Sequence, residues 1–197
     1  IGHWTRGPSS GGSSGDITIT ADDVFVGANG SFASADIGNS NYLGAEGNGA
    51  IGGNITVNAK TVTLLADSPN SGSFDEARIG NLGLNGTVTG TVKVTTTGDV
   101  EVLSYGPGAA SIGNFSNPRD IDYNPIQGKN SGSVLVQAGG NVTVSASDNS
   151  SYASIENGGA ASSGSVTVNA TGYVLESAAD GGGALIGDVE VAGAVHG

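Results

Sequence analysis

A short motif that returns six times along the chain constrains its fold more than any other feature. In each copy an isoleucine is followed by glycine or glutamate and then by Asn, Asp or His, and alanine stands two positions before the isoleucine wherever the chain extends that far. A motif that recurs at intervals of 31 to 43 residues is typical of solenoids, whose repeats stack and bury a face against each other. We therefore expect these residues to form structural columns along a stack. The isoleucines are Ile1, Ile37, Ile79, Ile112, Ile155 and Ile186, and the alanines are Ala35, Ala77, Ala110, Ala153 and Ala184.

Two other segments of each repeat have the pattern of β-strands. One is a glycine followed by alternating apolar and polar residues, and the other is a short segment with apolar residues at alternate positions. A period of two places the apolar side chains on one face of a strand and most polar side chains on the other. Together with the Ala-x-Ile segment, each repeat therefore predicts three short strands. The first segment recurs at 15–21, 53–59, 90–96, 132–138 and 164–170, and the second at 24–26, 62–64, 100–102, 142–144 and 173–175.

Three strands per repeat with glycine at the corners predict an all-β fold, a parallel β-helix (β-solenoid) of five to six coils. Coils stacked at ~4.8 Å pair each strand with its equivalents in the neighbouring coils and give a rod segment of roughly 25–30 Å. The longer intervals carry insertions, which we expect at the corners, at residues 4–12, 40–52, 67–76, 104–108 and 115–131. We interpret 1–197 as one β-solenoid segment of a longer fibre, with repeats of approximately 1–36, 37–78, 79–111, 112–154, 155–185 and a partial 186–197.

The composition argues against several classes of partner. Lys and Arg total 6 against 18 acidic residues, a net charge of −12, whereas nucleic-acid binding draws most of its affinity from cations placed on phosphates. The chain has no cysteine, so disulfides and Cys–zinc sites are excluded. No apolar run approaches the ~18 residues that a membrane span needs. We expect no nucleic-acid partner, no membrane insertion and no cofactor.

The polar residue at the end of each motif forms the most regular polar feature of the chain. Asparagine stacked on asparagine at a corner of a β-helix bonds from one coil to the next and tolerates turn conformations. We predict such a structural ladder, and the alternative is a groove whose side chains bind sugar or metal. The residues concerned are His3, Asn39, Asn81, Asn114, Asn157 and Asp188.

The longest insertion, residues 115–131, holds the best candidates for ligand binding. Its aromatic rings and carboxylates suit carbohydrate recognition, through ring stacking and hydrogen bonds to hydroxyl groups. The alternative is a loop whose aromatic rings fold onto the flank of the rod. Carboxylate and amide oxygens in this loop are of the kind calcium prefers, but the calcium-binding nonapeptide repeat of other solenoids is absent, and we expect no metal site. The candidates are Phe115, Arg119, Asp120, Asp122 and Tyr123, joined by Tyr42 from the preceding insertion in the same register.

Catalysis has to be considered, because parallel β-helices also include polysaccharide-degrading enzymes. Glycoside hydrolysis requires two facing carboxylates, and Asp99 and Glu101 stand two positions apart on one predicted strand. The basic residues that a lyase groove needs are scattered through different segments. A Ser-His-acid triad needs a histidine, and the only two are His3 and His196. We predict no catalytic residues and no enzyme activity.

The ordered set of motifs resembles the repeats of filamentous haemagglutinin-type exoproteins, the large bacterial adhesins of two-partner secretion. The best matches are Tyr-Ala-Ser-Ile-Glu-Asn-Gly-Gly at 152–159 and Ile-Gly-His at 1–3, and the resemblance covers the whole chain. The chain departs from the family pattern at 4–6 and at Glu156. The resemblance implies a right-handed fibre that is exported through an outer-membrane partner and is displayed on a bacterial surface or secreted.

Three functions follow as expectations. The first is a rod-forming adhesin segment that attaches to a host surface, a glycan receptor or neighbouring cells. The alternatives are a passive spacer that presents a distal binding or toxin domain and, with less support, a polysaccharide-active enzyme. Because a solenoid segment exposes unpaired strand edges at both ends, we also expect end-to-end stacking.

Overall fold

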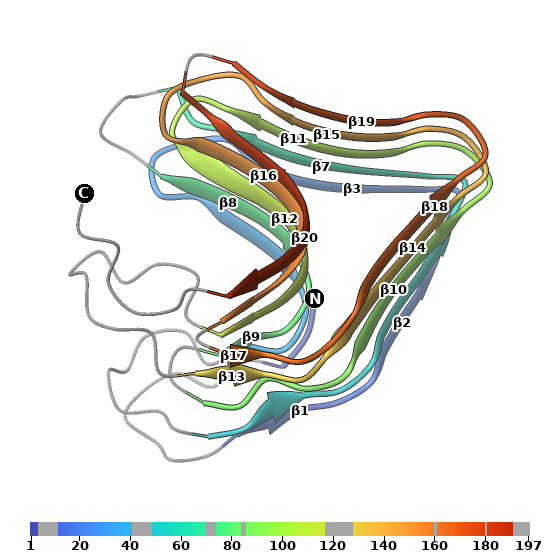
Figure 1. The fold of residues 1–197 in the computed structure, drawn as a ribbon, viewed down its shortest axis with the longest axis vertical. Coiled ribbons are helices and arrows are strands. Elements are labelled where there is room, and N and C mark those ends of the chain that lie inside the picture. The colour runs from blue at the N-terminus through green and yellow to red at the C-terminus, as the bar shows by residue number, and fades with distance from the viewer. Residues whose placement is uncertain are drawn as a thin grey trace.

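The computed structural model describes residues 1–3, 12–40, 49–69, 74–83, 86–116, 128–159, 161–179 and 181–190. These residues form twenty β-strands and no α-helix. Within this part of the chain there is accordingly no helix with the length and hydropathy of a membrane span. The strands wind into the five coils of a parallel β-helix (Figure 1).

Every coil gives one strand to each of three parallel sheets that run along the stack. The first sheet contains β2 (Ile17–Thr20), β6 (Ile55–Ala59), β10 (Thr91–Thr96), β14 (Ser133–Ala138) and β18 (Val166–Ala170). The second sheet contains β3 (Asp23–Ala28), β7 (Thr61–Asp67), β11 (Val100–Tyr105), β15 (Val142–Ala146) and β19 (Val174–Ala178). The third sheet contains β4 (Ser34–Ile37), β8 (Asp75–Ile79), β12 (Gly108–Ser116), β16 (Ser151–Gly159) and β20 (Gly183–Glu190), with β9 (Leu82–Gly83) beside β12.

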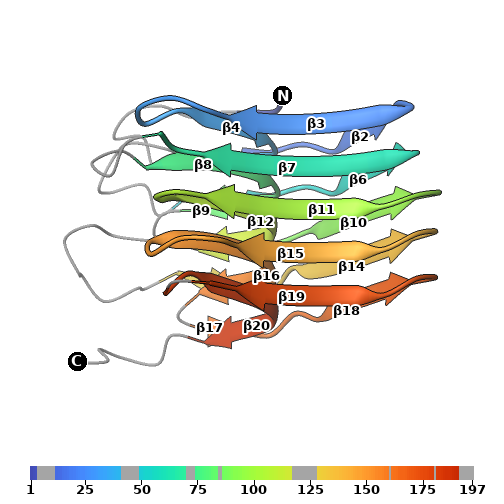
Figure 2. The ribbon, with the colours of Figure 1, turned by 90° about the horizontal axis from the view of Figure 1, so that it is seen from above.

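The coil is right-handed. In Figure 1 the chain runs anticlockwise from the first sheet through the second to the third, and it advances toward the viewer from blue to red. Figure 2 shows the coils from above as stacked layers, with β3 near one end of the stack and β19 near the other. The predicted all-β parallel β-helix with three strands per coil is confirmed.

A fourth, much shorter ladder closes each coil. Its two-residue strands are β1 (Ser13–Ser14), β5 (Ile51–Gly52), β13 (Lys129–Asn130) and β17 (Ala161–Ser162). Val88 bridges β5 and β13, so this ladder also passes through all five coils. The sequence does not predict it, because two residues are too few to show a period of two.

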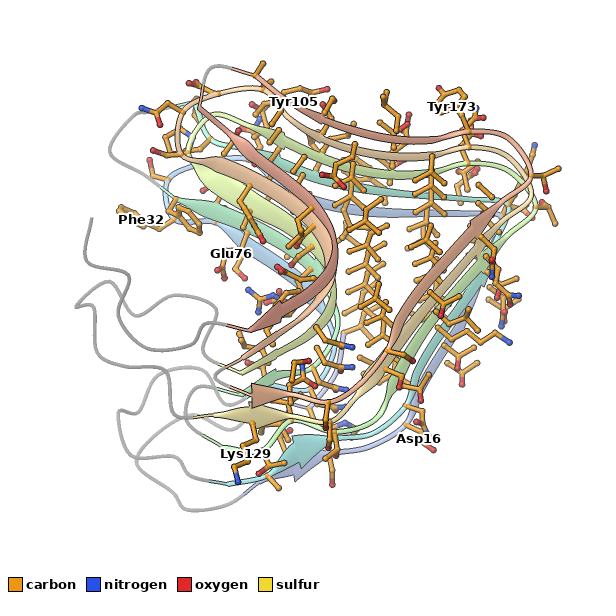
Figure 3. All side chains as sticks on the ribbon, viewed as in Figure 1. Asp16, Phe32, Glu76, Tyr105, Lys129 and Tyr173 are labelled. Carbon is orange, nitrogen blue, oxygen red and sulfur yellow. The ribbon has the colours of Figure 1, made fainter. Side chains whose placement is uncertain are left out.

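The core consists of apolar side chains that point into the interior of the coil and stack in columns from one coil to the next (Figure 3). Val62, Val100 and Val142 pair in register and are fully buried. Fully burying one such side chain contributes about 1.5–3 kcal/mol relative to leaving it exposed, so the columns supply most of the stabilisation. The recurring alanines and isoleucines pair in the same way, from Ala35 to Ala184 and from Ile37 to Ile186.

Glycine follows the isoleucine because the backbones of neighbouring coils approach each other closely there. A Cβ atom on Gly38 would lie 1.7 Å from the carbonyl oxygen of Gly80, and a Cβ atom on Gly80 would lie 1.6 Å from that of Gly113. Such contacts are impossible, so a side chain pointing in this direction would push the coils apart. In the fourth coil Glu156 occupies the column instead of glycine.

Candidate functional site

The asparagines of the recurring motif form a continuous chain of hydrogen bonds on the inner face of the third sheet. The side-chain Nδ2 of Asn39 donates to Oδ1 of Asn81 over 2.9 Å, and Asn81 donates to Asn114 over 3.0 Å. Asn114 donates in turn to Asn157 over 3.4 Å. At the N-terminal end, Nδ1 of His3 lies 3.0 Å from Oδ1 of Asn39. All four asparagines are fully buried.

The same amides bind the backbone at the corner between the third and first sheets. Nδ2 of Asn39 donates to the carbonyl oxygens of Gly15 and Gly52, each over 2.9 Å. An amide offers both donors and acceptors, so it satisfies carbonyl groups at the corner and its neighbour in the next coil together. The side chains are closed to ligands, and the geometry is that of the structural ladder rather than of a sugar or metal groove. The register of β20 places Asp188 opposite Asn157, as the motif predicts.

Most of the predicted ligand-binding residues lie outside the described part of the chain. These are Tyr42, Arg119, Asp120, Asp122 and Tyr123. Phe115 is described, and it belongs to β12 rather than to an exposed loop. It pairs with Leu82 on one side and Gly158 on the other, and only 3% of its surface is exposed. Of the two predicted alternatives, the burial of Phe115 agrees with a ring that packs on the flank of the rod, here from a strand that continues to Ser116. Ligand binding by the other five residues stays a prediction.

Phe115 contacts a charged cluster on the outer face of the third sheet. The guanidinium carbon of Arg78 lies 5.8 Å from the centroid of the Phe115 ring, a cation–π contact. Nη2 of Arg78 lies 2.8 Å from Oε2 of Glu76, and Nη1 lies 3.9 Å from Oδ1 of Asp36 in the preceding coil. Figure 3 shows Glu76 on the concave side of the sheet. We call Asp36, Glu76, Arg78 and Phe115 the outer cluster.

The outer cluster is largely shielded from solvent. The Arg78 side chain is 4% exposed, against 11% for Asp36 and 19% for Glu76. Removing one partner from a buried ion pair is costly, because it leaves a charge without water or counter-charge. The two carboxylates share one cation and one aromatic ring holds that cation in place, so the arrangement fixes β4 to β8. It does not present two free carboxylates to a substrate.

In the C-terminal coils, hydroxyl-bearing residues lie on this outer face. The Tyr152 hydroxyl donates to Oε2 of Glu156 over 3.0 Å, and Glu156 is 5% exposed. In the column of Asp36 and Arg78, the next residues are Ser111 and Ser154. Ser154 is fully buried, and its hydroxyl has no hydrogen-bond partner among the residues that the structure describes. This part of the face is as closed as the outer cluster.

The acidic pair considered for catalysis takes part in contacts between coils. Oδ1 of Asp99 accepts a hydrogen bond from the backbone N–H of Asn141 over 2.7 Å, and Oε2 of Glu101 accepts one from the Thr63 hydroxyl over 3.2 Å. Each carboxylate therefore joins its own coil to a neighbour. Among the residues that the structure describes, no three His, Asp or Glu side chains are grouped to hold a metal ion.

Sequence reasoning missed the outer cluster, although a signal for it exists. Aligning the repeats on alanine and isoleucine places Asp36 and Arg78 at the same position of adjacent repeats, with opposite charges. Glu76 stands two positions before Arg78, on the same face of a strand.

Sequence reasoning also missed Asn130. This residue is 1% exposed, and its Oδ1 accepts a hydrogen bond from the backbone N–H of Gly132 over 2.9 Å. It has no counterpart at a fixed place in the other repeats.

No protein-family model, curated protein or solved structure matches the chain. The fold therefore rests on the strand pairing described above. The resemblance to haemagglutinin-type exoproteins rests on the sequence motifs alone.

Proposed function

We propose that this chain is a rod-forming segment of a secreted or surface-displayed bacterial adhesin, which attaches to a host surface, a glycan or a neighbouring cell. The observation that carries the proposal is the in-register stacking of five coils in three parallel sheets. In such a stack each repeat contacts only its neighbours, so the architecture extends indefinitely in one dimension and presents its corners at regular intervals. Presentation along a rod is the role that this geometry supports best.

The strand order gives the insertions a common exit from the rod. The segment between β4 and β5 and the segment between β12 and β13 both connect the third sheet to the fourth ladder. The first carries Tyr42, and the second carries Arg119, Asp120, Asp122 and Tyr123. Their exits lie two coils apart, roughly 10 Å along the axis. An oligosaccharide laid along this edge would pass both exits, which supports the proposal of a glycan contact.

Export through an outer-membrane partner and location at the bacterial surface belong to the same proposal. Both are supported only by the resemblance of the repeats to two-partner-secretion adhesins. The passive spacer is the alternative that the same rod would serve, and the two roles differ in whether the corner insertions bind anything.

A binding assay with two loop variants tests the proposal. The purified chain is applied to a panel of glycans and host-surface proteins, beside a variant in which residues 117–127 are replaced by a short Gly-Ser link. The link leaves Ser116 and Lys129 in place, because they pair with Gly83 and Ala161. The matched control replaces residues 69–73, between β7 and β8, at the corner of the second and third sheets.

The adhesin proposal predicts that the wild-type chain and the control variant bind the same member of the panel, and that the 117–127 variant does not. Equal binding by all three forms would remove the insertion from the contact. No binding by any form would favour the spacer, which presents a distal domain.

A further inference from the structure

Two leucines lie side by side on the outer face of the second sheet. Leu65 in β7 and Leu103 in β11 pair in register. In both strands the positions before and after the leucine are buried, so the leucine side chains point away from the core and stay partly exposed. Apolar side chains that gather on a solvated face mark a contact site, whereas single ones are ordinary.

Two aromatic rings extend the apolar surface of the leucines. Gly27 pairs with Leu65, and a Cβ atom on Gly27 would lie 2.3 Å from Cε1 of Phe25. The Phe25 ring therefore covers Gly27 at the side of Leu65. Tyr105 stands two positions after Leu103 on the same face, is 41% exposed, and points to the outer side of the sheet in Figure 3. We call Phe25, Leu65, Leu103 and Tyr105 the leucine patch.

The leucine patch ends where the same column becomes polar. After Leu65 and Leu103 the column continues with Ser145 and Ser177, whose hydroxyl groups bond to each other over 2.9 Å. The patch is therefore a local feature of the first three coils and not a product of the repeat. It lies on the side of the rod, so a contact there is compatible with a fibre that continues at either end.

Carboxylates flank the leucines along both strands. Glu101 stands two positions before Leu103, and Asp67 stands two positions after Leu65, so both acids share the face of the leucines and are partly exposed. No lysine or arginine occurs in the five strands of this sheet, all of whose residues the structure describes. An apolar surface with acidic residues at its rim complements a partner that carries apolar side chains between cations.

The spacing of these groups fits an extended segment. Residues two positions apart on a strand are separated by roughly 6.6 Å, and neighbouring coils by ~4.8 Å. Because Glu101 pairs with Thr63, Glu101 and Asp67 lie four positions apart along the strand direction, about 13 Å. In an extended Lys-x-Leu-x-Lys segment the two lysines have the same separation. Its leucine would lie over Leu65 and Leu103 while its lysines approach the two acids.

We propose that the leucine patch binds a cationic amphipathic partner, an extended segment in which Leu-like side chains alternate with Lys or Arg on one face. The apolar side chains cover Leu65 and Leu103, and the cations approach Glu101 and Asp67. The contact is independent of the adhesin proposal, because it lies on the second sheet and not at the corner insertions. The same face of a second copy is a poor occupant, since its acids would repel those of the first.

Fluorescence anisotropy with two labelled peptides tests the proposal on the purified chain. The first peptide, Lys-Ser-Leu-Ser-Lys-Ser-Leu-Ser-Lys, places lysine and leucine on one face when it is extended. The second has serine in place of leucine, so it carries the same charge and measures attraction by charge alone. The leucine peptide should bind at least roughly 10-fold more tightly, and its affinity should fall as the salt concentration rises. Equal affinities of the two peptides would overturn the proposal.

Leucine substitutions on two sheets locate the contact. Leu65→Thr combined with Leu103→Thr introduces the residue that already stands outward at Thr63, and it should weaken binding of the leucine peptide roughly 10-fold. The matched control is Leu135→Thr on the outer face of the first sheet, where the leucine pairs with Lys93. The control should leave the affinity unchanged. Retained affinity in the double variant, or an equal loss in the control, would overturn the leucine patch as the site.

Glu101→Gln tests the acidic rim separately. Glutamine keeps an oxygen that can accept the hydrogen bond of the Thr63 hydroxyl, so the substitution removes the charge alone. Binding of the leucine peptide should weaken roughly 3-fold at low ionic strength, and the difference should vanish in 1 M NaCl. The control is Asp16→Asn, because Asp16 is an outward acid beside the first sheet whose Oδ1 accepts the N–H of Asn54 over 2.7 Å. Equal losses in the two variants would show that net charge attracts the peptide, and would overturn the proposal.

Discussion

The two faces of the third sheet both bury polar side chains, and they use different chemistry to do so. On the inner face, neutral amides repeat in four successive coils, and each is bonded to its neighbours in the stack. On the outer face, Asp36, Glu76 and Arg78 form one charged group that involves only β4 and β8. Farther along the same outer column, the buried hydroxyl of Ser154 has no hydrogen-bond partner in the described part of the chain. The inner face is periodic and satisfied, whereas the outer face is local and only partly satisfied.

The difference follows from what each group can do when it is repeated. An amide donates and accepts, so identical side chains bond to each other at every step of a stack. Like charges in one column would stand ~4.8 Å apart and repel by about 1 kcal/mol in water, and by more where water is excluded. A charged column must therefore alternate in sign or stop after one pair. Amides can specify a rod of any length, whereas an ion pair marks one place on it.

The largest effect is expected from breaking the inner ladder with Asn81→Leu. The substitution removes the acceptor of Asn39 and the donor to Asn114, and it leaves the carbonyl oxygens of Gly53 and Thr89 without the amide. Buried polar groups without a partner cost about 1–3 kcal/mol each, so we expect the free energy of unfolding to fall by about 4 kcal/mol. Urea denaturation followed by circular dichroism measures it.

The control for Asn81→Leu is Asn58→Leu, which makes the same chemical change on the outer face of β6, where the side chain is partly exposed. We expect the control to change the free energy of unfolding by less than about 0.5 kcal/mol. Equal losses in the two variants would show that the amide ladder contributes nothing beyond ordinary packing.

A smaller effect is expected on the outer face from Arg78→Met. The methionine keeps most of the apolar contact with Phe115 but leaves Glu76 and Asp36 as two partly exposed carboxylates without a cation. We expect a loss of about 2 kcal/mol, below the value for a fully buried pair because both acids retain some access to water. Since salt screens the remaining repulsion, the loss should shrink in 1 M NaCl.

Lys93→Met serves as the control for Arg78→Met. Lys93 lies on the outer face of β10, and no ion pair is described for it. Its replacement should leave the free energy of unfolding nearly unchanged at both salt concentrations. A loss for Arg78→Met that is as large as that for Asn81→Leu, or that does not change with salt concentration, would contradict the difference between the two faces.

The same contrast explains how far the sequence predicts the molecule. The columns of Ala77, Ile79 and Asn81 are readable because each residue recurs at one place in every repeat, and a repeated residue in a solenoid points to a stacked neighbour. The sequence predicts a loop from Phe115 onward, because no periodic residue marks the end of the strand. Arg78 was overlooked because it occurs once, and its partners come from the three-dimensional register of two coils. Periodic contacts are visible as recurring residues, whereas a unique contact such as that of Arg78 with Asp36 becomes visible only after the repeats have been aligned and their charges compared.

The smallest and sharpest test compares two serines that are equally buried. Ser104 and Ser154 are both fully buried. The Ser104 hydroxyl donates to the carbonyl oxygen of Gly108 over 3.0 Å, whereas the Ser154 hydroxyl has no partner within the described ranges. Ser104→Ala should lower the free energy of unfolding by about 1 kcal/mol, because it removes a satisfied hydrogen bond from a fully buried site. Ser154→Ala should leave the free energy of unfolding unchanged or raise it by up to about 1 kcal/mol. The substitution removes a hydroxyl that loses its hydration on folding without a compensating hydrogen bond from the described residues. Thermal unfolding of the two variants, measured side by side, gives the sign of each change. Equal destabilisation would mean that the outer column is satisfied throughout, and the contrast between the two faces of the sheet would then lie in charge alone.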